Sequence, residues 1–217
     1  MADLLLYTRT TDYRHDSIPD GVRALRELAA DHGLTVEATE DPAAFRPERL
    51  AGCGAVVFLS TSGEVLDEPG RAALRQYVGS GGGFVGIHAA TTCETGWDWY
   101  GGLVGARFAG HPEIQPATLH VEDGDHPATA HLPAGLPWTD EWYDFHTPPR
   151  AAGVRVLLTV DESSYQGGSM GADHPIAWCA EYAGGRSFYT ALGHSPAHYS
   201  DASFRQHLWG GIHYALG

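Results

Sequence analysis

Imidazole side chains stand at the ends of two apolar, strand-like runs. Gly83–Ile87 is followed at once by His88, and Phe188–Leu192 is followed by Gly193 and His194. The carboxyl ends of parallel strands form one rim of a sheet, and ligands bind at that rim. Neutral imidazole there can bind a metal ion or act as a base. We therefore expect both histidines to face one site, although His88 could instead cap a helix that follows it.

A short acidic and aromatic run, Asp140-Glu141-Trp142-Tyr143, supplies candidate carboxylates. Carboxyl groups flanked by apolar rings have raised pKa values, which suits a general acid or base near neutral pH. The expected catalytic residues are therefore His88 and Glu141, with Asp140 beside them. The alternative is that both acids lie on a surface loop while their aromatic neighbours lie in the core.

Three imidazoles and one carboxylate form the expected metal-ligand set: His88, His111, Glu141 and His194. Such a set suits zinc or a similar divalent ion. His111 precedes Pro112, which favours extended backbone at the histidine. His15 follows the first apolar run, so it would lie on the same rim as a substrate-binding residue, or in solvent as an ordinary loop histidine. A site without metal would rely on His88 and Glu141 alone.

Aromatic side chains gather in the middle of the chain and could stack on a sugar ring. The candidates for substrate binding are Trp97, Trp99, Trp142 and Tyr143. Exposed aromatic side chains there could also serve a contact between copies of the chain, as in a homo-oligomer. Nucleophilic catalysis is disfavoured, because there is no G-x-S-x-G motif and Cys93 lies five residues beyond His88.

Composition excludes several classes of function. The formal net charge is −14, and all 13 basic residues are arginine. A surface so acidic disfavours nucleic acid and anionic membranes as partners. The absence of lysine removes Schiff-base chemistry and the phosphate-loop lysine, and no nucleotide cofactor is expected. No apolar run reaches the ~18–20 residues of a membrane span. The N-terminus resembles a first strand and not a signal peptide. Three cysteines without metal spacing fit a cytoplasmic protein.

Strands and helices alternate over the first 90 residues. Strands are expected at Leu4–Thr8, Leu34–Thr39, Ala55–Leu59 and Gly83–Ile87, with helices from Ser17 to Gly33 and over Glu68–Val78. Further strands are expected at Ala117–Val121, Val154–Val160, Pro175–Glu181 and Arg186–Leu192, and a closing helix at Phe204–Tyr214. This alternation predicts one α/β domain over residues 1–217, with a mainly parallel sheet and a large insertion-like middle.

The chain resembles the ThuA-like family, named for trehalose utilisation. The stretches that carry the resemblance run in order along the chain: R-H-D-S-I (14–18), G-G-G-F-V-G-I-H-A-A-T (81–91), W-D-W-Y-G-G-L-V-G-A-R-F (97–108), H-P (111–112), D-E-W-Y (140–143), H-P-I-A-W (174–178) and G-R-S-F-Y-T-A-L-G-H (185–194). The resemblance implies a flavodoxin-like fold of the class I glutamine amidotransferase type, a mainly parallel sheet with helices on both faces. In that fold a cysteine stands at the strand-to-helix elbow, where this chain has His88.

Two functions follow from the residues and the resemblance together. The first is an enzyme acting on a sugar or keto-sugar, a small carbohydrate-like substrate, by isomerisation, elimination or hydrolysis with possible help from a metal ion. Glutamine hydrolysis is not expected, because imidazole cannot replace the thiolate. The second is a non-catalytic sugar-binding or regulatory domain, in which the aromatic rings stack on the ligand and the histidines donate hydrogen bonds.

Overall fold

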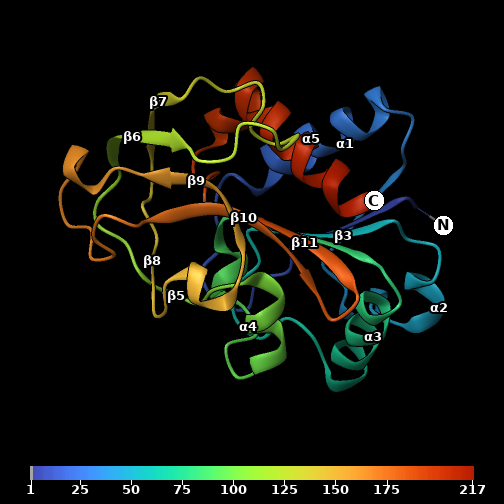
Figure 1. The fold of residues 1–217 in the computed structure, drawn as a ribbon. Helices are drawn as coiled ribbons and strands as arrows, with labels where there is room; N and C mark the ends of the chain where they lie inside the picture. Colours follow the sequence, from blue (N-terminus) through green and yellow to red (C-terminus); the bar gives the residue numbers. More distant parts are fainter. Residues whose placement is uncertain (1) are drawn as a thin grey trace.

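A nine-stranded sheet organises the computed structural model, which describes residues 2–217 (Figure 1). The strands lie in the order β2-β1-β3-β4-β11-β10-β9-β6-β7, and β5 and β8 form a separate two-stranded sheet. Their bounds are β1 Leu4–Tyr7, β2 Val36–Thr39, β3 Ala55–Leu59, β4 Gly83–Ile87, β5 Phe108–Gly110, β6 Gln115–Val121, β7 Gly135–Asp140, β8 Asp144–Phe145, β9 Arg155–Val160, β10 Pro175–Tyr182 and β11 Gly185–Thr190.

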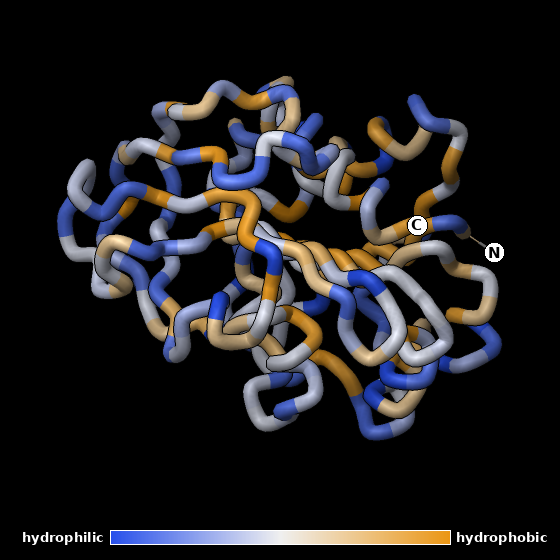
Figure 2. The backbone as a smooth tube through the Cα atoms, in the orientation of Figure 1, coloured by the Kyte–Doolittle hydropathy of each residue, from blue (hydrophilic) through white to orange (hydrophobic). Residues whose placement is uncertain are grey.

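Five of the strands, β2-β1-β3-β4-β11, are parallel to their neighbours. Strands β1, β3 and β4 are buried along their whole length, as parallel strands covered on both faces should be. Their continuous apolar runs cross the middle of the molecule (Figure 2). Four of these five strands end at the rim that carries the candidate site: β1 leads to His15, β3 to Ser60, β4 to His88 and β11 to His194.

The other four strands are antiparallel, so the expectation of a mainly parallel sheet is correct only for half of it. Strand β10 pairs with β11 and β9, and β6 pairs with β9 and β7. The hairpin from β10 to β11 turns at Ala183 and Gly184, both with positive φ. Strands joined by such short turns must run antiparallel, whereas parallel neighbours need a long crossover. The middle of the chain therefore extends the sheet instead of forming a separate insertion.

Helices cover both faces of the parallel half, as expected. Helices α1 and α5 lie on one face, and α2, α3 and α4 lie on the other (Figure 1). The helices span α1 Ile18–Asp31, α2 Pro47–Leu50, α3 Glu68–Gly79, α4 Asp98–Val104 and α5 Ala202–Leu216; short 3₁₀ turns span Pro42–Ala44, His88–Thr92, Pro149–Ala152, Glu162–Ser164 and Pro196–Ser200. Among the described residues, no helix has both the length and the apolar character needed to cross a membrane.

Two contacts fix the loops of the rim relative to one another. Ser17, the residue before helix α1, makes no capping bond and instead donates its hydroxyl to the Gly193 carbonyl at 3.2 Å. Ser62, in the loop after β3, donates its hydroxyl to the Tyr13 carbonyl at 2.6 Å. The loops that follow β1, β3 and β11 are thus tied together around the site.

Candidate functional site

His88 occupies a strained elbow at the end of β4. Its φ is +53°, in the left-handed region that side-chain-bearing residues avoid, at a cost of about 1–3 kcal/mol. The side chain is fully buried. Its Nδ1 lies 2.7 Å from the Ala191 carbonyl. A carbonyl only accepts, so Nδ1 carries the proton and neutral His88 presents the Nε2 lone pair to the site.

His15 faces His88 nitrogen to nitrogen. The two Nε2 atoms are 3.0 Å apart, and the rings meet edge to face at 4.5 Å. His15 is buried, and its Nδ1 has no hydrogen-bond partner. Burial lowers its pKa, which favours the neutral ring. Two neutral nitrogens at this distance either share one proton or direct two lone pairs at one cation.

His194 completes the set of imidazoles from the loop after β11. Gly193 precedes it with φ +117°, and a Cβ at Gly193 would lie 2.8 Å from the Tyr199 hydroxyl, so glycine is required there. The Nδ1 of His194 lies 3.1 Å from Glu141 Oε2, but its direction does not make a hydrogen bond. A buried polar atom so close to a carboxylate, yet not bonded to it, indicates that both groups are directed at a common point.

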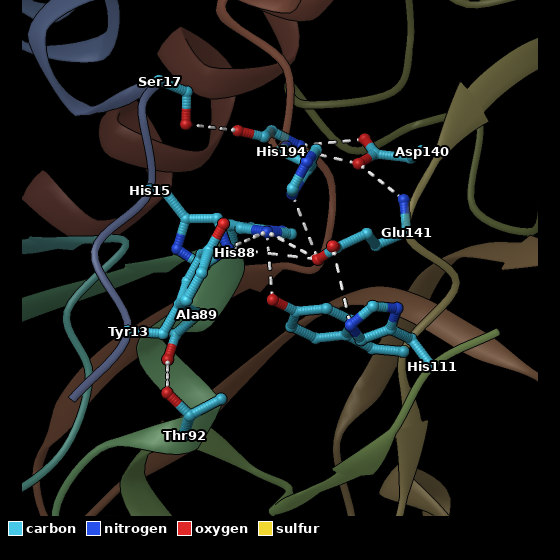
Figure 3. Close-up of polar contacts among 12 residues, drawn as sticks. Tyr13, His15, Ser17, His88, Ala89, Thr92, His111, Asp140, Glu141 and His194 are labelled. Carbon is cyan, nitrogen blue, oxygen red and sulfur yellow. Dashed lines mark hydrogen bonds and ion pairs between the residues drawn. The ribbon is translucent and has the colours of Figure 1, made fainter. Parts of the chain in front are cut away.

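Glu141 lies at the centre of these rings (Figure 3). Its Oε2 is 3.3 Å from His88 Nε2, 3.1 Å from His194 Nδ1 and 4.0 Å from His15 Nε2. Burial alone would raise the Glu141 pKa. The contacts with His15, His194 and His88 outweigh burial and hold the pKa well below its usual range. Glu141 is therefore a carboxylate, and the predicted raised pKa is wrong because imidazoles and not apolar rings surround it.

The cluster formed by His15, His88, Glu141 and His194 fits a divalent metal ion. One ligand atom from each residue lies within 4.8 Å of all the others. Ligand atoms ~2.0–2.1 Å from a tetrahedral ion are about 3.3 Å apart. Four of the six distances between these atoms are 3.0, 3.1, 3.3 and 4.0 Å. Three nitrogens and one carboxylate oxygen are also the donor chemistry of zinc and similar borderline ions.

The structure places His15 within the cluster and His111 at its edge, the reverse of what we expected from the sequence. His15, expected at the edge, belongs to the cluster. His111, expected as a ligand, is about one-third exposed and contacts the outer oxygen of Glu141, with Nε2 3.5 Å from Oε1. The Nδ1 of His111 donates to the Pro112 carbonyl at 2.8 Å, so Nε2 is the nitrogen on the Glu141 side that is left for proton exchange.

Both carboxylate oxygens of Asp140 accept hydrogen bonds that hold the segments of the site in place. Its Oδ1 accepts the N–H groups of Glu141 at 2.9 Å and His194 at 3.2 Å. Its Oδ2 accepts the N–H groups of Gly193 at 3.0 Å and the Trp138 indole at 3.1 Å. The carboxylate is buried and has no free lone pair directed at the cluster. The expectation that Asp140 acts as an acid or base is therefore not supported by its contacts.

The tryptophans do not form the expected stacking surface. Trp142 is fully buried and donates its indole N–H to the Gln115 carbonyl at 2.9 Å. Trp97 and Trp99 stack on each other at 4.9 Å and contact the Arg75 guanidinium. Tyr143 does reach the cluster: its buried hydroxyl lies 3.0 Å from His88 Nε2. Without a metal ion, the lone pair of that nitrogen accepts the hydroxyl proton, whereas a bound ion would take the same lone pair; burial raises the pKa of Tyr143.

Tyr13 is the functional candidate that the sequence analysis missed. It lies edge to face with His15 at 4.8 Å, and it is 64% exposed. A cavity of about 560 Å³ lies beside it, lined also by Thr92, Phe108, His111 and Tyr143. The signal available was its position two residues before His15, in the loop after the first strand.

A second group of potential ligands, Asp144, Glu162 and His174, has hydrogen-bond partners in the neighbouring segments. His174 donates Nε2–H to the Tyr143 carbonyl at 2.9 Å, and its Nδ1 lies 2.8 Å from Glu162 Oε1 and 3.1 Å from the Tyr165 hydroxyl. Asp144 accepts the backbone N–H and the hydroxyl of Ser169. Glu162 also accepts the Met170 and Gly171 N–H groups. This group braces the segment that carries Glu141 and Tyr143.

Cys93 is not arranged as a nucleophile. It is fully buried, within 3.4 Å of the Thr61 hydroxyl and 3.2 Å of the Tyr100 hydroxyl. Burial raises the pKa of its thiol to about 12. The thiolate fraction near neutral pH is therefore negligible.

Solved structures share this architecture over nearly the whole chain. A putative ThuA-like protein from Bacteroides uniformis is 25% identical, covers 98% of this chain and 90% of its own, and has a TM-score of 0.82. One from Parabacteroides merdae is 20% identical, with 99% and 90% covered and a TM-score of 0.79. A β-galactosidase from Rahnella sp. R3 shares the fold at 15% identity over 99% of this chain and 32% of its own, with a TM-score of 0.63. No curated protein matched the sequence.

The comparison with family models confirms the resemblance seen in the sequence. The ThuA model, described as trehalose utilisation, matches residues 3–215. Such a match includes every residue of the cluster and the whole of the nine-stranded sheet. The chain therefore belongs to the ThuA family.

Proposed function

We propose that the chain is an enzyme that uses a divalent metal ion to act on a carbonyl group of a neutral sugar, such as a keto-sugar. One observation carries the proposal: ligand atoms of His15, His88, Glu141 and His194 converge within 4.8 Å of one another beside a cavity. A divalent ion bound there would polarise a carbonyl oxygen or acidify a water molecule.

The chain's own residues divide the remaining tasks. With Glu141 held among three imidazoles, the group left to move a proton is His111. Its Nδ1–H is committed to the Pro112 carbonyl, so its Nε2 accepts a proton, and its ring lines the cavity. Proton removal from carbon beside a keto group leads to isomerisation or elimination. The same pair of groups could instead direct a water molecule for hydrolysis.

A neutral, hydroxylated substrate suits the cavity. Its lining contains hydroxyl groups of Tyr13, Ser62, Thr92 and Thr95, and no arginine. A phosphate or carboxylate on the ligand would meet Glu141 and Asp12, and no arginine in the lining would balance its charge. The family's description, trehalose utilisation, is consistent with a neutral sugar.

The metal is tested on purified protein after exhaustive dialysis. We expect about one zinc or similar ion per chain by elemental analysis, lost in His15→Ala and His88→Ala and kept in His120→Ala, an exposed histidine on β6. Activity is tested by NMR as deuterium uptake from solvent into neutral keto-sugars such as D-fructose and 3-keto-D-glucose. Sugar binding that persists after chelation and in Glu141→Gln, with no turnover, would instead favour a non-catalytic binding domain.

A further inference from the structure

The hydroxyl group of Tyr143 lies at the boundary between the cluster and the cavity of about 560 Å³. Tyr143 lines that cavity, and so do two members of the cluster, His15 and Glu141. Its side chain is buried, and its oxygen is 3.0 Å from His88 Nε2. A ligand atom that enters the cluster from this cavity therefore arrives beside the phenol.

Packing and a backbone hydrogen bond fix the position of this phenol. The centroid of its ring lies 4.7 Å from that of His88, 4.6 Å from that of Phe108 and 5.8 Å from that of His111. The backbone carbonyl of Tyr143 accepts the Nε2–H of His174 at 2.9 Å. A donor held in this way needs no rearrangement when negative charge develops beside it, which is the property that makes such donors effective in catalysis.

Metal binding would release the hydroxyl from His88. The Nδ1–H of His88 is committed to the Ala191 carbonyl, so its Nε2 has a single lone pair to offer. That lone pair would become the bond to the ion, and the Tyr143 hydroxyl would then need another acceptor. Two acceptors are available: a carboxylate oxygen of Glu141, or an oxygen atom of the ligand that enters from the cavity and binds the ion as an additional ligand.

The contacts of Glu141 favour the ligand oxygen as the acceptor. Glu141 Oε2 already lies 3.3 Å from His88 Nε2 and 3.1 Å from His194 Nδ1, and its Oε1 lies 3.5 Å from His111 Nε2. The oxygen of an entering ligand, in contrast, would gain its first hydrogen bond from this side of the cavity. A buried donor there is strongest where the charge on its acceptor increases during the reaction.

We infer that Tyr143 is a catalytic residue whose hydroxyl group donates a hydrogen bond to the carbonyl oxygen of the substrate. As the C–H bond beside the carbonyl breaks, His111 Nε2 takes the proton and the electron pair of that bond forms a C=C bond. The π electrons of the carbonyl move to its oxygen, and the hydrogen bond from Tyr143 stabilises the negative charge that develops there. The inference rests on the proposed function, because that function supplies the ion and the proton acceptor.

The experiment removes the hydroxyl and keeps the ring. Tyr143→Phe is compared with wild-type protein and with Tyr77→Phe, a buried tyrosine outside the cavity lining whose hydroxyl donates to the Gly54 carbonyl at 2.9 Å. The probe is acetohydroxamate, which binds divalent ions through two oxygen atoms and resembles the charged state of the substrate. Calorimetry on the zinc-loaded full chain measures its affinity, and competition with a chelator measures the affinity for zinc.

We expect Tyr143→Phe to keep the zinc affinity of the wild type and to bind acetohydroxamate at least about tenfold more weakly, ~1.4 kcal/mol. Deuterium uptake into a keto-sugar should slow by about 10²–10³-fold in the same variant. Tyr77→Phe should match the wild type in all three measurements.

An unchanged affinity of Tyr143→Phe for acetohydroxamate would overturn the inference. So would a loss of zinc affinity of about 10–100-fold with unchanged binding of the probe, because that result places the hydroxyl on Glu141 as a positioning residue. Wild-type protein that binds no zinc would refute the proposed function itself, and that outcome is distinct from zinc-loaded protein in which the hydroxyl makes no difference.

Discussion

Replacing Asp140 with asparagine tests whether this residue positions the site or takes part in proton transfer. The buried carboxylate accepts N–H groups from Glu141 and His194 on one oxygen and from Gly193 and Trp138 on the other. Asparagine keeps one acceptor oxygen and places an NH₂ group where the other stood. In either orientation of the amide, its NH₂ group faces two of these N–H donors, which are then left without an acceptor.

The size of the effect follows from those contacts. A hydrogen bond to a charged group contributes about 1.5–3 kcal/mol, so the loss of two predicts a decrease of roughly 3–6 kcal/mol in the free energy of unfolding. This is large beside the ~5–15 kcal/mol stability of an ordinary domain. Metal affinity should also fall, by about 10–100-fold, because Asp140 orients the backbone of two proposed ligands.

Urea unfolding with linear extrapolation measures the first effect, and metal titration measures the second. Asp173→Asn is the matched control, since Asp173 is exposed and pairs only with Arg150 at the surface. A loss below about 1 kcal/mol in Asp140→Asn, comparable to the control, would refute the positioning role. So would normal stability and metal content combined with lost turnover, because that result assigns Asp140 to the chemistry.

Two further predictions concern other histidines. His207 is buried between the Ala128 carbonyl and the Thr190 hydroxyl, and burial lowers its pKa to about 4 from 6.5. Between pH 6.5 and 4 the unfolded chain therefore binds a proton at His207 that the folded chain does not bind, and about 3 kcal/mol of stability is lost as the pH falls through that window. The free energy of unfolding of His207→Gln should lack this part of the pH dependence. An unchanged pH profile would contradict the assignment. His111→Asn should keep the metal and lower kcat by about 10²–10⁴-fold, as removal of a general base does, and simultaneous loss of metal would show that His111 is a ligand.

Much of the parallel half could be predicted from the sequence, because buried parallel strands are continuous apolar runs. Ala55–Leu59 and Gly83–Ile87 were predicted with the observed bounds, and β1 differs by one residue. The edge strand β7 was missed because Gly135–Asp140 contains a proline and half of it faces solvent. Helix α4 was missed because its two glycines and two aromatic residues resemble a loop.

The positions of site residues that directly follow a strand could be predicted from the sequence. The positions of those that depend only on tertiary packing could not. His88 and His194 follow β4 and β11, so their convergence could be inferred from the topology of a parallel sheet. The burial of Trp142, the choice of His15 over His111, and the engagement of Asp140 depend on how β7 and β8 fold over the rim. No local pattern in the sequence encodes that fold.

The elbow after β4 holds His88 in a left-handed backbone conformation at the rim of the sheet. Its left-handed backbone projects one side chain from the sheet rim whatever that side chain is, and here the Ala191 carbonyl fixes the ring by accepting its Nδ1–H. A cysteine at this position would act through its own sulfur, whereas one imidazole lone pair has little catalytic power alone. Its use depends on partners from other loops, and His15, Glu141 and His194 arrive from the ends of β1, β7 and β11. If the four groups hold one metal ion, as we propose, removal of any one of them should abolish the same activity.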